Sequence, residues 1–355
     1  MSIGGRAKFL SAIATPKSDK NSVRMGFALI VMSNILAGGR YTDAGAARSE
    51  RLLGSNALFS NVAVPWARDY LALLKPRVMS LVVFTGFTGL ILAPGDLHPV
   101  RAALAVLCIA AAAGGAGAIN MWYEHDIDAL MPRTRNRPIP AGRLAPENAF
   151  IFGLCISFAS VVLMGVAINW VSAALLAFAN CFYIFVYTIW LKRRTPQNIV
   201  IGGAAGAMPP VIGWAAATGS IGLEPLAMFL IIFMWTPPHF WSLSLYRTDE
   251  YAKAGVPMLP VVSGKPATKR CILIYTILLV PISFAPLILG IAGSGYGTAA
   301  AVMGSIMLLF AIQVMGERSD HAARRMFRFS ILYLFILFLA LIVERLSAVI
   351  FTQLS

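Results

Sequence analysis

The chain has 355 residues, of which 58% are hydrophobic and only 12% are charged. Soluble domains carry about twice that share of charged residues, so the composition excludes an ordinary soluble protein and indicates a polytopic membrane protein. A net charge of +14 would suggest nucleic-acid binding in a soluble chain, but here the basic residues must first be placed relative to the membrane spans.

Residues 1–65 differ from the remainder of the chain. They are basic, poor in acids and rich in Ser, Ala and Gly. Their apolar stretch, residues 26–37, has only about half the length that a spanning helix needs. We therefore predict an amino-terminal extension over residues 1–65, either disordered or lying at the membrane interface, followed by a transmembrane domain over residues 66–355.

Apolar segments of spanning length follow one another through the transmembrane domain. They lie near residues 78–94, 100–121, 149–168, 171–191, 199–217, 226–246, 271–291, 298–315 and 327–345. The sequence therefore predicts an all-α polytopic membrane protein with nine transmembrane helices.

Basic residues are distributed unequally between the two sides of these spans. Of the 29 Lys and Arg residues, all but Arg101 and Arg345 lie in the amino-terminal part up to Arg77, or in and beside the loops that follow spans two, four, six and eight. The positive-inside rule then places the amino terminus in the cytoplasm. Topology and contact with an anionic lipid bilayer explain the net charge, so we expect no nucleic-acid partner.

A polar segment, residues 120–143, follows the second span directly. Asn120, Glu124 and Asp128 are spaced four residues apart, so on a helix they lie near one face. Like charges at a membrane boundary need a compensating cation. An all-oxygen set suits Mg²⁺, which usually shares its coordination shell with water and substrate phosphates. We predict that these three residues bind Mg²⁺; a solvated cytoplasmic loop is the alternative.

Basic residues accompany this segment. Arg133 and Arg137 follow the acids and are candidates for binding an anion. Lys192 begins a basic run at the end of span four. It is either a positive-inside anchor or a further ligand of the same anion.

Two later spans contain Pro-Pro pairs, at Pro209-Pro210 in span five and at Pro237-Pro238 in span six. Broken helices at membrane depth are tolerated where they line a cavity. We therefore predict that both spans break and border a central cavity; ordinary kinks are the alternative.

A second polar group of residues follows span six. Asp249 and Glu250 lie just past an apolar run, with Tyr246 and Arg247 beside them. Both acid clusters fall on the predicted cytoplasmic side, and two such clusters suit two metal sites that face one diphosphate. We predict Asp249 and Glu250 as metal ligands, and Tyr246 and Arg247 as substrate-binding residues.

The first polar segment, DIDALMPRTRNRPIPAGR, together with the motif Asn120, Glu124 and Asp128, resembles the UbiA-type intramembrane prenyltransferases. Glu124 stands where that family usually has Asp, and Asp249 and Glu250 are adjacent rather than spaced as in the usual second motif. Two further segments, GGAAGAMPPVIGWAAATG (202–219) and WTPPHFWSLSLYRTDEYAKAGVPMLPVV (235–262), are similar to the branch of the family that farnesylates haem.

This resemblance implies helices around a central cavity with cytosolic active-site loops. It implies transfer of a farnesyl group from farnesyl diphosphate to a vinyl group of haem b, with a hydroxyl added from water to give haem O. It also implies Mg²⁺ and diphosphate binding by Asn120, Glu124, Asp128 and Asp249, an anion clamp of Arg133, Arg137, Lys192 and Arg247, and a downstream haem A synthase as a partner.

His239 is the only histidine well inside a predicted span, and large aromatic rings surround it in sequence. Because an imidazole can ligate haem iron, we infer that His239 binds the haem substrate; a packed, hydrogen-bonded histidine is the alternative.

Two other functions suit parts of the pattern. Broken helices with polar clusters also occur in secondary transporters, although transporter sites lie near the bilayer midplane rather than at span ends. A prenyltransferase with an aromatic or quinone-precursor acceptor is the closer alternative. Without a clear presequence, we expect a bacterial inner membrane rather than a mitochondrial inner membrane.

Overall fold

The computed structural model describes residues 67–95, 97–317 and 319–354, and these residues form helices without any strand. Residues 65–355 belong to one compact unit. The predicted extension over residues 1–65 lies outside the described part of the chain.

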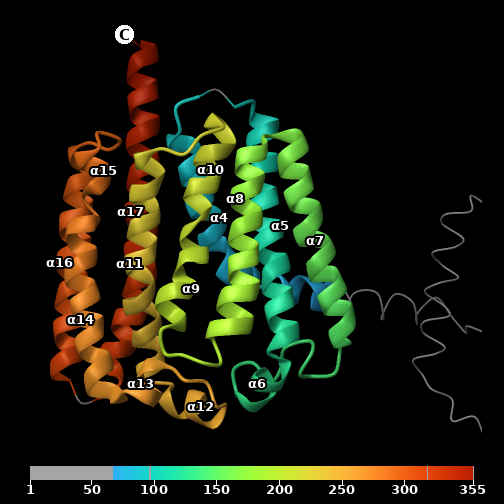
Figure 1. The fold of residues 1–355 in the computed structure, drawn as a ribbon. Coiled ribbons are helices and arrows are strands. Elements are labelled where there is room, and N and C mark those ends of the chain that lie inside the picture. Colours follow the sequence, from blue (N-terminus) through green and yellow to red (C-terminus); the bar gives the residue numbers. More distant parts are fainter. Residues whose placement is uncertain (1–66, 96, 318, 355) are drawn as a thin grey trace, which may run out of the picture. The chain divides into compact units, whose positions relative to one another are not determined.

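Eight spans in the described residues are long and apolar enough to cross a membrane (Figure 1). A ninth results if the short helix Ala67–Leu73 is joined to α4 (Pro76–Leu92), which is bent from it by 54°. The eight are α5 (Pro99–Tyr123), α7 (Pro146–Ala167), α8 (Trp170–Cys181) with η1 (Phe182–Leu191), α9 (Asn198–Ala207) with α10 (Pro209–Thr218), α11 (Leu223–Leu245), α14 (Gly264–Ile282) with α15 (Ala285–Ile288), α16 (Ser294–Gly316) and α17 (His321–Leu354). The predicted all-α polytopic fold is confirmed.

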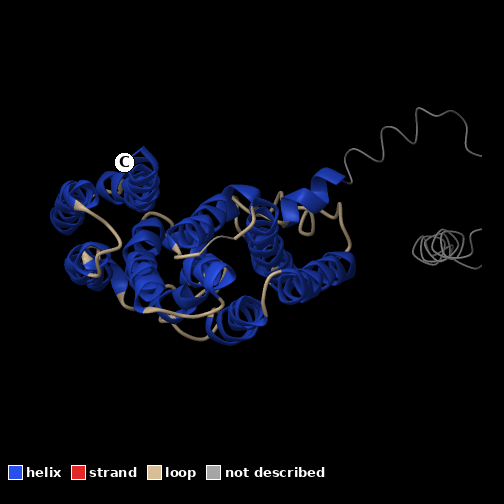
Figure 2. Cartoon of the chain, turned by 90° about the horizontal axis from the view of Figure 1, so that it is seen from above, coloured by secondary structure: helices blue, strands red, loops and turns tan. Residues whose placement is uncertain are grey.

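Close helix contacts depend on residues without a side chain. A Cβ atom built on Gly115 of α5 would lie 2.7 Å from the carbonyl oxygen of Gly153 in α7, and one built on Gly89 of α4 would lie 2.0 Å from the carbonyl oxygen of Pro210 in α10. These backbones therefore touch directly, as small residues allow in membrane helices. Figure 2 shows the resulting bundle with its helices seen nearly end-on.

The two Pro-Pro pairs behave differently. Span five is interrupted only at Met208, between the end of α9 at Ala207 and the start of α10 at Pro209, and the two helices form one span that is not bent by more than 40°. The predicted break in span six is wrong, since α11 runs without interruption through Pro237 and Pro238 to Leu245. Each proline removes one helical hydrogen bond. Residues on both sides of the Pro-Pro pair bind α17 and so stabilise this part of α11. The Trp235 indole donates to the Ser330 carbonyl (2.7 Å), and the His239 ring forms a hydrogen bond with the Ser330 hydroxyl (2.7 Å).

Three short helices lie at one end of the bundle: α6 (His125–Leu130), α12 (Thr248–Lys253) and α13 (Leu259–Val262) (Figure 1). Ile127 of α6 and Tyr251 of α12 belong to one buried apolar cluster. The loops that follow the second and sixth spans are therefore held together by hydrophobic packing. This places both predicted polar segments at the same end of the molecule.

Candidate active site

The first polar motif forms a buried group at the end of α5. Asn120 is 3% exposed, Glu124 3% and Asp128 4%. Glu124 follows the last residue of α5, Tyr123, and caps both that helix and α6, which begins at His125. Backbone hydrogen bonds from Glu124 to Asn120 (3.0 Å) and from Asp128 to Glu124 (2.8 Å) nevertheless preserve the four-residue spacing. The three side chains therefore stay on one side of the chain, as the spacing predicted.

Each buried carboxylate has a basic partner from another segment. The Lys192 ammonium donates to Glu124 Oε2 (2.5 Å), and the Arg137 guanidinium donates to Asp128 Oδ2 (2.6 Å). Burial, the largest single effect, would lower the pKa of Lys192, but the Glu124 carboxylate and the neighbouring Tyr187 and Tyr183 together outweigh it, and the pKa lies above its ordinary value. Lys192 is therefore charged and part of the site in this structure.

Lys75 completes the cluster, and sequence reasoning missed it. Its ammonium donates to Asn120 Oδ1 (2.8 Å), while Asn120 Nδ2 donates to Thr188 Oγ1 (3.2 Å). Lys75 has φ 50° and ψ 53°, and it is the only described residue other than glycine with positive φ. Such left-handed backbone costs about 1–2 kcal/mol and is often found at functional sites. The available signal was the Lys-Pro pair that opens α4, since a proline restricts the residue before it.

The segment that carries Thr188 and ends just before Lys192 is a π-helix, η1, of 10 residues. π-Helical segments are rare and are frequently found at functional sites. The ring of Tyr187, in the same segment, lies 5.5 Å from the Lys192 ammonium. At the other side of Lys192, Asn198 of α9 donates to the Lys192 carbonyl (3.4 Å). The lysine is thus held from both neighbouring segments.

Other charged residues near the motif point away from this cluster. Asp126 is exposed and pairs with Arg193 (2.7 Å), whose hydrogen bond lowers the pKa of the Asp126 carboxyl. Arg133, predicted as part of the anion clamp, is exposed in the same loop. The acids at positions 124, 126 and 128 therefore differ in burial: Glu124 and Asp128 lie on the inner side of the segment, and Asp126 lies on the outer side.

The oxygen atoms of the cluster are suited to Mg²⁺. Glu124 Oε1 is buried and has no hydrogen-bond partner among the described residues, and such an orphaned carboxylate oxygen needs a cation or a donor. Within the described part of the chain no three His, Cys, Asp or Glu side chains converge on one point. Mg²⁺ commonly takes only one or two protein carboxylates and completes its shell with water and substrate phosphates, so two carboxylates are a sufficient protein contribution.

The second predicted group is arranged differently. Glu250 pairs with Arg247 (2.8 Å), and Asp249 is exposed. The Tyr246 ring lies between two guanidinium groups, at 5.7 Å from that of Arg247 and 4.4 Å from that of Arg324. The segment is near the first cluster through the packing of α6 and α12, but among the described residues no hydrogen bond or ion pair joins its acids to Asn120, Glu124 or Asp128.

His239 lies deeper, against α17. Its ring is stacked between Trp235 (centroids 4.3 Å apart) and Phe327 (4.7 Å). The Ser330 hydroxyl donates to the Phe327 carbonyl (2.7 Å), so the same hydroxyl oxygen accepts the hydrogen of His239 Nδ1 (2.7 Å). In that tautomer Nε2 carries a free lone pair, the form in which a histidine ligates a metal.

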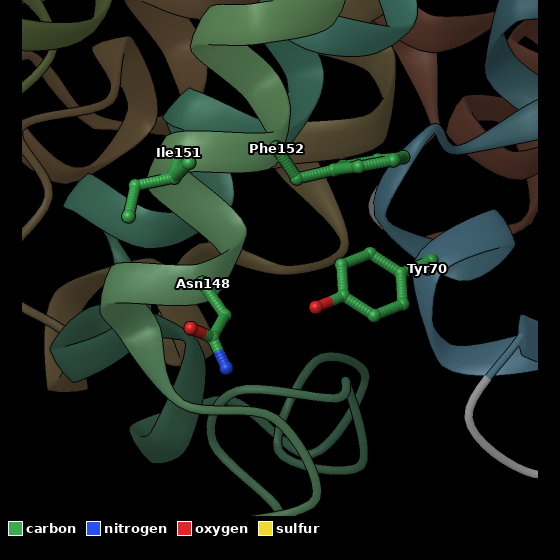
Figure 3. Close-up of a pocket in the computed structure, with 4 residues that line it drawn as sticks. All are labelled: Tyr70, Asn148, Ile151 and Phe152. Carbon is green, nitrogen blue, oxygen red and sulfur yellow. The ribbon is translucent and has the colours of Figure 1, made fainter. Parts of the chain in front are cut away.

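Several hollows lie outside the charged cluster, and two of them border α5 or α7. A wide groove of about 370 Å³ lies between the Ala67–Leu73 helix and α7, and Figure 3 shows Tyr70, Asn148, Ile151 and Phe152 around it. Its lining has no charged side chain, so it does not suit a diphosphate. A second, mainly apolar cavity lies among α4, α5, α8, η1, α9 and α10. The described residues of α11 do not line it, contrary to the prediction that spans five and six border one cavity.

Comparisons with known proteins agree with this architecture. The profile of the UbiA prenyltransferase family matches residues 82–342. A protohaem IX farnesyltransferase of Rhodopseudomonas palustris is 61% identical over 280 residues, covering 78% of this chain and 90% of the relative. One from Parvibaculum lavamentivorans is 57% identical over 293 residues, covering 81% and 92%.

Solved structures share the fold at low sequence identity. A digeranylgeranylglyceryl phosphate synthase has a TM-score of 0.67 at 19% identity, covering 79% of this chain and 99% of that one. A UbiA homologue from Archaeoglobus fulgidus, solved with GPP and Mg²⁺, has a TM-score of 0.54 at 17% identity, covering 77% and 99%. Since the family profile and the close relatives each span most of the chain, this multi-pass membrane protein belongs to the UbiA prenyltransferase family.

Proposed function

We propose that the protein transfers the farnesyl group of farnesyl diphosphate to a vinyl group of haem b, with addition of water, and so forms haem O and diphosphate. The observation that carries this proposal is the buried cluster of Glu124 and Asp128 with Lys75, Lys192 and Arg137 at the polar end of a membrane bundle. The acceptor is proposed from relatives that are 57–61% identical and are named protohaem IX farnesyltransferases.

The charges of the cluster suit a prenyl diphosphate. With Lys75 protonated, three cations and two carboxylates would leave one positive charge in excess, because Arg137 pairs with Asp128 and Lys192 pairs with Glu124, while Lys75 contacts the neutral Asn120. One Mg²⁺ would raise the excess to about three charges, which matches a fully ionised diphosphate ester. Glu124, Asp128 and Asn120 would hold that ion, and when bound it supplies Lewis-acid stabilisation of the leaving diphosphate.

The protein's own groups perform the remaining tasks. Lys75, Lys192 and Arg137 hold the diphosphate in place, and their charge stabilises the negative charge that develops as the C–O bond breaks. The apolar cavity below them keeps bulk water away from the allylic cation. Arg247 and Tyr246 are proposed to bind substrate at the rim of the site, with Arg133 as an exposed cation in the loop after α6 and Asp249 and Glu250 as ligands for a second metal ion.

The activity assay uses purified protein in lipid nanodiscs with farnesyl diphosphate, Mg²⁺ and haem b. We expect a haem whose mass has grown by a farnesyl group plus water. Asp128→Asn keeps the shape but removes one buried charge, so turnover should fall by about two orders of magnitude or more. Asp126→Asn is the matched control, because Asp126 is exposed and pairs outside the cluster, and it should retain most activity.

Three outcomes would contradict parts of this proposal. Near-normal turnover of Asp128→Asn would remove Asp128 from the site. Prenylation of 4-hydroxybenzoate with haem left unchanged would assign the aromatic acceptor instead. Transport of a substrate without any covalent product would indicate the transporter alternative.

We infer further that His239 ligates the iron of the haem substrate through Nε2. The hydrogen bond to Ser330 and the stacking on Trp235 and Phe327 support this role, because they fix the ring and leave Nε2 unprotonated. His239→Ala should weaken haem binding more than diphosphate binding and should shift the absorption spectrum of bound haem. His125→Ala is the control, since His125 is exposed. An unchanged spectrum in His239→Ala would return the histidine to a packing role.

The proposed location is the bacterial inner membrane with a cytoplasmic amino terminus; a mitochondrial inner membrane is the alternative. A downstream haem A synthase is the proposed consumer of the product. The basic loops and the cluster would then face the cytoplasm, where a soluble diphosphate is available.

Single cysteines introduced into a cysteine-free variant test this orientation. Arg194 and Ser294 are both exposed and lie at opposite ends of their spans, after η1 and at the start of α16. We expect an impermeant thiol reagent applied to intact cells to label Arg194→Cys only after the membrane is opened, and to label Ser294→Cys directly. The reverse pattern would overturn the orientation and place the site outside.

A further inference from the structure

The apolar cavity lies directly below the charged cluster and has a volume of about 90 Å³. Ala116 and Ala113 of α5 line it, four and seven residues before Asn120, so it extends about 6–10 Å deeper than the motif at 1.5 Å per residue. Tyr183 lines it from η1, and its ring centroid is 5.2 Å from that of Tyr187, which contacts Lys192. The cavity therefore lies beside the charged cluster, on its deeper side, near the place where the farnesyl C1 atom must react.

One polar group in this cavity has no partner. Asn180, at the end of α8, is 8% exposed and lines the cavity, and its Nδ2 is buried without a hydrogen-bond partner among the described residues. An unsatisfied buried donor costs about 1–3 kcal/mol. Tyr183 carries the other polar side chain of the lining. A buried amide whose N–H group has no hydrogen-bond partner is suited to binding a small polar ligand that is present only during the reaction.

We propose that the Asn180 amide holds the water molecule that is added to the acceptor. This inference rests on the proposed function, in which one water must reach a carbocation inside a cavity that otherwise has to exclude water. An apolar cavity offers water no fixed position, because a bound water needs two or more polar partners. The Asn180 amide and the Tyr183 hydroxyl are the side-chain groups of the lining that can provide them.

The reaction balances with these groups. The C1–O bond of farnesyl diphosphate breaks, and its electron pair leaves with the diphosphate. The π electrons of the vinyl group form a bond from its terminal carbon to C1, which leaves a cation on the carbon next to the porphyrin ring. The oxygen of the held water bonds to that carbon, and the proton that it loses passes to the departing diphosphate. No external oxidant or reductant is needed.

The same cation has a second fate when no water is in place. It loses a proton from the adjacent CH₂ group and gives an alkene, whose mass is lower than that of the hydroxylated haem by one water. The ratio of alkene to alcohol therefore reports on the held water alone. It does not depend on how fast the protein turns over or how much of it is folded.

The experiment measures that ratio by mass spectrometry in the haem assay, with wild type, Asn180→Leu, Asn180→Ser and Tyr183→Phe. We expect the alkene to rise at least about tenfold in Asn180→Leu and much less in Asn180→Ser, whose hydroxyl can still hold a water. Ala174→Leu is the matched control on α8, because Ala174 is exposed on the outer face, and it should leave the ratio unchanged.

A second variant distinguishes the effect of filling the cavity from the effect of losing the held water. Gly206 lines the cavity, and a Cβ built on it meets no atom within 4 Å. Gly206→Leu should therefore fit the fold, fill the cavity and lower turnover without raising the alkene fraction as Asn180→Leu does.

The following results would overturn either the proposed role of Asn180 or the proposed function. An unchanged ratio in either active Asn180 variant would overturn the proposal, whatever the rate. A change in Tyr183→Phe alone would place the water on the tyrosine and also overturn it. If both Asn180 variants are folded but release no diphosphate, Asn180 acts before the hydration step and the proposal is wrong. If wild type leaves haem unchanged, the proposed function fails instead.

Discussion

Two carboxylates buried at the edge of a membrane require compensating cations, and the active end of this protein is arranged around that requirement. An isolated buried charge is strongly unfavourable, yet Glu124 and Asp128 are almost fully buried. Their partners Lys192 and Arg137 come from different segments, and Lys75 joins them through Asn120. The cluster thereby connects the start of α4, the end of α5, the end of η1 and the loop after α6. Breaking one pair would leave a buried charge uncompensated, so the cluster holds these segments together as well as binding a ligand.

The bundle separates polar and apolar tasks along its axis. The charged cluster lies where α5 and η1 end, and the apolar cavity begins within about two helical turns of it. Direct backbone contacts, such as those of Gly89 and Gly115, pack the surrounding helices closely. A prenyl diphosphate fits this division, because its head is anionic and its tail is apolar. The proposed chemistry needs both: stabilisation of the leaving group at one end and exclusion of water at the other.

Local sequence patterns predicted those parts of the site that depend on one segment. The spacing of Asn120, Glu124 and Asp128 survives the boundary between α5 and α6 at Glu124, because i to i+4 hydrogen bonds continue across it. Lys192 could be either an anchor or a ligand, since its partner is 68 residues away in sequence. Lys75 was missed for the same reason, with its partner 45 residues away. The continuity of α11 through two prolines was also not predictable, because it depends on contacts with α17.

We propose above all that the buried cluster binds a prenyl diphosphate together with Mg²⁺. The most direct measurement is calorimetric titration of the protein in nanodiscs with farnesyl thiolodiphosphate, an unreactive analogue, with Mg²⁺ present or removed by a chelator. We expect Mg²⁺ to tighten binding at least about tenfold, or about 1.4 kcal/mol, and we expect this gain to be lost in Asp128→Asn. Equal affinity with and without Mg²⁺ would contradict this proposal.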